Sequence, residues 1–109
     1  MGDDTATGPD FHSAIELIGK RWTGVILQHL LAGPLRFNEL RDRIPRITDA
    51  MLSQRLKELE AAEVVERLVT VARPVEVRYT LTPIGTKLEP VLAAVLTWSK
   101  EWAAAHRLT

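Results

Sequence analysis

The chain has 109 residues, of which 46% are hydrophobic and 26% charged, the size and composition of one globular domain rather than of a disordered or fibrous protein. Its 14 basic and 14 acidic side chains give a formal net charge of zero, and the absence of cysteine excludes a disulfide scaffold, a thiol nucleophile and a cysteine-ligated metal site. No apolar run approaches the roughly 18 residues of a membrane span, and the acidic N-terminus does not resemble a secretory signal, so we expect a cytoplasmic protein.

The N-terminal residues 1–10 predict a disordered tail, because Gly, Thr, Asp and Pro occur there without apolar periodicity. We expect the folded domain over residues 11–109. Its first helix is predicted by apolar residues spaced four, three and four apart, namely Phe11, Ile15, Ile18 and Trp22.

A second helix is predicted to end before Gly33-Pro34. Only Gln28 and His29 interrupt its apolar stretch from Val25 to Leu31. We therefore expect this helix to be buried around most of its circumference.

Two further helices follow in close succession. The first covers residues 37–44 and ends before Pro45, because proline disfavours helical backbone in the residue before it. Thr48 is expected to cap the second through its hydroxyl group. The inward stripe of that second helix consists of Leu52, Leu56 and Leu59. Its opposite face is small, polar or basic and consists of Ala50, Ser53, Gln54 and Lys57.

The pattern then changes to that of strands. Residues 64–71 are rich in β-branched side chains, residues 75–82 alternate with period two, and the basic loop Ala72-Arg73-Pro74 lies between them. This predicts two antiparallel strands that form a hairpin.

The last helix is predicted over about residues 83–106, with Pro83 in its first turn and a kink or a split at Pro90. Its apolar residues recur at spacings of four and three, as in a coiled coil, which predicts a dimer seam. The predicted seam residues are Leu88, Val91, Leu92, Val95, Trp98 and Trp102.

Catalytic chemistry has little support in the sequence. None of the three serines lies in a nucleophile-elbow motif, the three histidines lack metal-ligand spacing, and phosphate-binding glycine motifs are absent. We therefore expect neither an enzyme nor a bound metal or cofactor.

The order of elements is instead that of a winged helix-turn-helix, a mostly α fold with a small β-hairpin (α+β). In such domains the second helix of the motif enters the major groove of double-stranded DNA. The base-edge candidates are therefore Ala50, Ser53, Gln54 and Lys57, and Gln54 can pair bidentately with adenine. The candidates for the DNA backbone or the wing are Arg36, Asn38, Thr48, Arg55 and Arg73.

The charges are distributed in blocks although their total is zero. Residues 20–57 contain eight basic and three acidic side chains, a net charge of +5. A DNA phosphate responds to charge within about 8–10 Å and not to the total of the chain. Such blocks also occur as solvated faces, so charge alone does not establish DNA binding.

Four segments in order resemble the HxlR family of bacterial winged-helix transcriptional regulators, which are MarR-like. Residues 17–23 are similar to its IGGKW opening, and residues 33–40 resemble its G-x-x-R-F-x-E-L segment. Residues 47–60 resemble its recognition helix, I-S-x-K-x-L-T-x-x-L-(R/K)-x-L-E, and residues 75–85 resemble its V-E-Y-x-L-T-x-x-G wing strand.

The resemblance implies a homodimer that forms through its first and last helices and binds a pseudo-palindromic operator. Family members often sense oxidants or electrophiles through a cysteine before the first helix, and Pro9 occupies that place here. Ala50 stands where a lysine is usual, and the second glycine of the opening motif is missing.

Two alternatives stay open at this point. A winged helix can serve as a protein-interaction module that does not bind DNA. Trp98 and Trp102 can also line a pocket for a small-molecule effector beside the dimer cleft, in addition to forming the seam.

Overall fold

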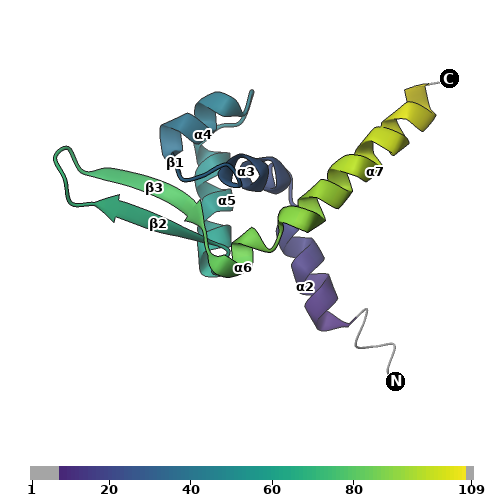
Figure 1. Ribbon diagram of the computed structural model, residues 1–109, viewed down its shortest axis with the longest axis horizontal. Helices are drawn as coiled ribbons and strands as arrows, with labels where there is room; N and C mark the ends of the chain where they lie inside the picture. The colour runs from purple at the N-terminus through teal and green to yellow at the C-terminus, as the bar shows by residue number, and fades with distance from the viewer. Residues whose placement is uncertain (1–7, 108–109) are drawn as a thin grey trace.

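The computed structural model describes residues 8–107 (Figure 1). Most of the predicted tail, residues 1–7, lies outside the described residues. The first described helix, α2 (Pro9–Ile18), begins two residues before the predicted start. Proline is favourable there because the first N–H groups of a helix have no partner within the helix.

A tight turn joins α2 to α3 (Thr23–Leu30). A Cβ atom on Gly19 would lie 2.6 Å from the carbonyl oxygen of Ile15, so the close backbone approach requires glycine at this position. The left-handed backbone conformation in the turn belongs to Trp22, with φ of 79°, and not to Lys20. This explains why the motif keeps its first glycine and tolerates the loss of its second.

The prediction that α3 is buried around most of its circumference is wrong. Ile26, Leu27 and Leu30 are almost completely buried, but Val25 remains 41% exposed and Gln28 is exposed. The exposed side of α3 faces a groove beside the C-terminal helix.

The predicted helix-turn-helix is present as α4 (Phe37–Arg43) and α5 (Asp49–Ala61). The Thr48 hydroxyl accepts a hydrogen bond from the Met51 amide at 3.1 Å, which confirms the predicted N-cap. At the other end of α5, the amide of Val64 donates to the Leu59 carbonyl and that of Glu63 to the Glu60 carbonyl, each at 2.9 Å. This pair of bonds is a Schellman motif, which ends the helix and turns the chain into the next strand.

The sheet contains three strands where the sequence pattern predicts two. Strands β2 (Val65–Thr70) and β3 (Glu76–Leu81) form the predicted antiparallel hairpin. The additional strand is β1 (Leu35–Arg36), which pairs with β3 and gives the order β1-β3-β2. Two residues are too few to show alternation, so β1 has no periodic signal in the sequence.

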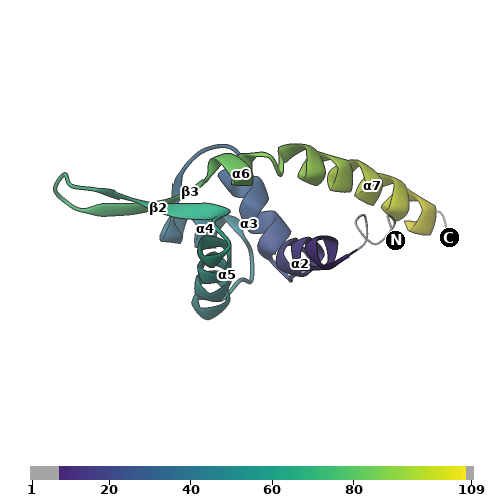
Figure 2. The ribbon, with the colours of Figure 1, turned by 90° about the horizontal axis from the view of Figure 1, so that it is seen from below.

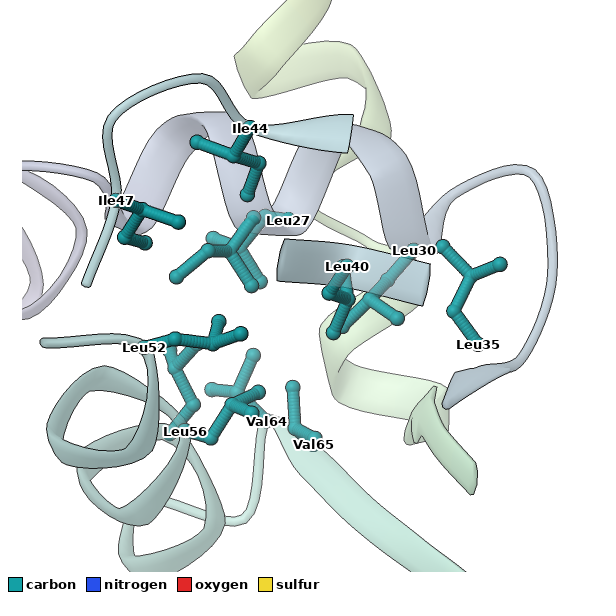
Figure 3. Packing of buried hydrophobic residues seen from close by; sticks show 12 residues of the cluster. Leu27, Leu30, Leu35, Leu40, Ile44, Ile47, Leu52, Leu56, Val64 and Val65 are labelled. Atoms are coloured by element: carbon teal, nitrogen blue, oxygen red, sulfur yellow. The ribbon is translucent and has the colours of Figure 1, made fainter. Parts of the chain in front are cut away.

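The core lies where α3, α4 and α5 meet the start of β2 (Figure 3). Aliphatic side chains fill it without a charged group. Its buried hydrophobic residues are Ile26, Leu27, Leu30, Leu35, Leu40, Ile44, Ile47, Leu52, Leu56, Leu59, Val64 and Val65.

The C-terminal segment is split in two, as predicted from Pro90. Helix α6 (Pro83–Thr86) ends shortly before α7 (Glu89–Arg107) begins, and Pro90 lies in the first turn of α7. No residue of α7 is fully buried. Figure 1 shows the hairpin and α7 extending in opposite directions from the core. The radius of gyration is 16.1 Å, above the roughly 13 Å expected for a compact chain of this length, which reflects these extensions.

Candidate nucleic-acid interface

The two faces of α5 differ as predicted. Leu52, Leu56 and Leu59 are 0%, 1% and 0% exposed, so the inward stripe is completely buried in the core. On the other face Ala50, Gln54 and Lys57 are exposed, and Ser53 is partly buried. Figure 2 shows that α5 projects from the body of the domain, with the hairpin extending to one side. The face with the predicted base-edge residues is therefore accessible.

A polar cluster, made of Lys20, Gln54, Arg55 and Glu58 and named here the Glu58 cluster, supports this face. The Glu58 carboxylate accepts from Gln54 Nε2 at 3.0 Å, from Arg55 Nη1 at 3.0 Å and from Lys20 Nζ at 3.3 Å. The Gln54 hydrogen bond, with help from Lys20 and Arg55, lowers the pKa of Glu58 below its ordinary value, so the carboxylate is ionised at neutral pH.

The Glu58 cluster also ties α5 to the turn between α2 and α3. Arg55 donates from Nε to the Arg21 carbonyl at 2.9 Å, and its side chain is only 15% exposed. The sequence pattern did not identify Lys20 or Glu58 as neighbours of the predicted site. Because Lys20 and Glu58 are 38 residues apart, only the tertiary fold reveals their proximity.

The remaining backbone candidates lie at the starts of helices and on the wing. Arg36 precedes α4 and is about half exposed; its guanidinium lies 3.5 Å from Glu39 and 3.9 Å from Glu76. Its backbone amide donates to Glu39 at 2.8 Å, and this bond is the main cause that lowers the pKa of Glu39. Asn38 is exposed in the first turn of α4, and Thr48 is exposed although its hydroxyl caps α5.

Arg73 is exposed and belongs to the loop between β2 and β3, which is the tip of the wing. Figure 1 shows that this loop lies far from the core. No ion pair within residues 8–107 involves Arg73 or the exposed Lys57. Both cations are therefore available to a phosphate or a base. Arg41, in contrast, pairs with Asp49 at 3.3 Å and joins α4 to α5.

The predicted seam residues divide into two groups. Leu88 and Leu92 pack partly against the core. The others remain exposed: Val91 by 40%, Val95 by 55%, Trp98 by 58% and Trp102 by 52%. The rings of Trp98 and Trp102 stack with their centroids 5.7 Å apart.

Other apolar side chains lie near this end of the molecule. Phe11 and Ile15 of α2 are about half exposed, and α2 and α7 extend from the side opposite the hairpin (Figure 2). A groove of about 240 Å³ lies between α3 and α7. It is lined mainly by Val25, Leu92, Val95 and Leu96.

Other kinds of site find no support in the described residues. Residues 8–107 contain no group of three His, Asp or Glu side chains arranged to hold a metal ion. No helix within this range combines the length and the apolar character that crossing a membrane requires.

Known proteins are similar to this chain in both sequence and fold. The YodB regulator of Bacillus subtilis, named an HTH-type transcriptional regulator, is 47% identical over 86% of this chain and 84% of its own length. The reduced form of YodB has a TM-score of 0.80 over 85% of this chain and 91% of that chain. The reduced form of the redox regulator HypR is 34% identical, with a TM-score of 0.83 over 92% of this chain and 99% of that chain. YodB has also been solved after diamide treatment and with quinone bound.

The family assignment covers most of the chain. The profile of the family described as HxlR-like helix-turn-helix matches residues 17–107, which include the helix-turn-helix, the wing and α7. The relatives are transcriptional regulators, in agreement with the prediction that the chain is not an enzyme. The resemblance seen in the four sequence motifs is thus confirmed, and the chain belongs to the HxlR-like helix-turn-helix family of transcriptional regulators.

Proposed function

We propose that this protein regulates transcription by binding a pseudo-palindromic operator in double-stranded DNA as a homodimer. The observation that carries the proposal is the exposed face of α5, which presents Ser53, Gln54 and Lys57 while the opposite face is buried in the core. A glutamine amide matches the donor and acceptor on the major-groove edge of adenine, and a lysine can reach guanine or a phosphate. Ala50 adds a small residue that permits close approach to the bases.

Contacts to the DNA backbone are assigned to residues around α5. Arg36 and Asn38 at the start of α4 and Thr48 at the start of α5 are exposed and suited to phosphate. Arg73 on the wing is suited to the minor groove or its flanking phosphates. A phosphate contact by Arg55 stays a prediction, because its guanidinium already bonds Glu58 and the Arg21 carbonyl.

The homodimer is proposed to form through α2 and α7. Support comes from the exposed apolar side chains on both helices and from their location on the side of the molecule away from the wing. Exposed apolar clusters of this kind are typical of protein interfaces. A role on DNA also fits the expected cytoplasmic location.

Regulation is proposed to differ from thiol sensing. Diamide oxidises thiols, and this sequence contains no cysteine that it could oxidise. We propose that control comes from a small-molecule effector at the dimer cleft, beside Trp98 and Trp102, or from the abundance of the protein. An effector at the cleft would act only if it binds the protein more tightly at one spacing of the two recognition helices than at another.

A salt titration with two variants tests DNA binding against the alternative of a protein-interaction module. Gln54→Ala should weaken the best site by roughly 1–3 kcal/mol and leave binding to random DNA unchanged. Arg73→Ala should weaken binding to all sequences and reduce the slope of log K against log salt by about 1. Equal losses on the best site and on random DNA would remove Gln54 from base reading. The absence of salt-dependent duplex binding in the wild type would favour the protein-interaction module.

A further inference from the structure

Gln54 does not stand alone on the exposed face of α5. Its Nε2 atom donates to the Glu58 carboxylate at 3.0 Å, one helical turn further along. That carboxylate is itself held by Arg55 on the same helix and by Lys20 from the turn after α2. Glu58 is also only 20% exposed, so its position is well defined by its neighbours.

The chemistry of an amide leaves the adenine-reading groups free. A glutamine amide has two N–H donors and one carbonyl oxygen with two acceptor sites. Bidentate pairing with adenine needs one N–H for N7 and the oxygen for the N6 amino group. The second N–H can be donated to Glu58 at the same time. A bond to an acceptor-only carboxylate also requires that the nitrogen, and not the oxygen, faces Glu58.

We propose that Glu58 is a positioning residue that holds the Gln54 amide in the orientation that reads adenine. The inference rests on the proposed function, because it assigns the support of a base-reading side chain. Without Glu58, the amide samples several rotamers and both flips, and fixing it on DNA costs conformational freedom. Glu58 therefore contributes to sequence specificity without touching DNA.

The charge of Glu58 makes its effect separable from simple destabilisation. A carboxylate near the DNA repels phosphate, so its removal leaves Lys20 and Arg55 more available and favours binding to any duplex. Loss of Glu58 should thus lower specificity while random-DNA affinity stays equal or rises. A partly unfolded protein would lose both.

The test measures binding of Glu58→Ala to the site that the wild type prefers and to the same site with each base pair replaced in turn. Discrimination in favour of adenine at one position of each half-site should fall about two- to tenfold, the cost of ordering one side chain. Glu60→Ala is the matched control, because Glu60 carries the same charge on the same helix and forms no ion pair within residues 8–107. It should leave discrimination unchanged.

A double-variant cycle shows whether Glu58 changes base discrimination through Gln54. In the Gln54→Ala background, Glu58→Ala should have no further effect on base discrimination, since the side chain that it positions is gone. If Glu58→Ala does not fold, Glu58→Gln is the substitute, because it keeps the shape but weakens the contacts to Lys20 and Arg55. It should lower discrimination in the same direction.

The outcomes separate this inference from the proposed function. Unchanged discrimination in both Glu58 variants, or an equal effect of Glu58→Ala with and without Gln54, overturns the positioning role while DNA reading by the wild type still stands. A wild type that prefers no sequence refutes the proposed function itself, and the positioning role with it.

Discussion

Replacement of Trp98 by alanine tests the proposed dimer surface most severely. Trp98 is 58% exposed in the single chain. With about 200 Å² of accessible surface for a tryptophan side chain, roughly 115 Å² is left for a partner to bury. At about 25 cal/mol per Å², complete burial of this area in both protomers stabilises a two-fold dimer by about 6 kcal/mol, and burial of half of it by about 3 kcal/mol. Trp98→Ala should therefore raise the dimer Kd by about a hundredfold or more.

Sedimentation equilibrium over a range of protein concentrations measures this change directly. Val71→Ala is the control, because Val71 is 96% exposed on the wing, outside the proposed interface. It should leave the dimer Kd unchanged, and circular dichroism should show that both variants keep the wild-type helix content. A Trp98→Ala protein that dimerises as tightly as the wild type would refute the assignment of the seam to α7.

Three further predictions concern stability and regulation. Gly85→Ala should lower the free energy of unfolding by about 1–3 kcal/mol in urea titrations, because a Cβ there would collide with the Val64 carbonyl oxygen; an unchanged midpoint would contradict this packing. The pKa values of Glu39 and Glu58 are lower in the folded state, so the ionised carboxylates stabilise the folded protein. This stabilisation is fully present above the ordinary pKa of 4.5 and is lost as the pH falls through the folded-state pKa values. The thermal unfolding midpoint should therefore change little between about pH 7 and pH 5 and should decrease at pH values below about 4.5. The decrease should be less steep in Glu58→Gln, and an equally steep decrease in that variant would exclude Glu58 as a contributor. Diamide should leave operator affinity unchanged because the sequence has no thiol, whereas release from the operator by diamide would contradict the proposed mode of regulation.

The faces of α5 could be predicted from the sequence because burial imposes a period on the chain. Leu52, Leu56 and Leu59 repeat with helical spacing, so the position of the core determines which residues face solvent. Thr48 was predictable for a local reason as well, since a cap depends only on the residues that follow it.

Features that depend on tertiary contacts could not be predicted in this way. The strand β1 has two residues and exists only because β3 pairs with it. The exposure of Val25 follows from the position of α7, which a helical pattern does not specify. The contact between Lys20 and Glu58 joins residues that are distant in sequence, and neither residue type by itself indicates such a pairing.

The central claim, that a two-fold dimer reads DNA through α5, is tested most directly by selecting bound duplexes from a random pool at low salt and sequencing them. The account predicts enriched sequences with two-fold symmetry, whose half-sites lie one helical turn apart, about 10 base pairs from centre to centre. Enrichment of asymmetric sequences only, or no enrichment at all, would contradict the account.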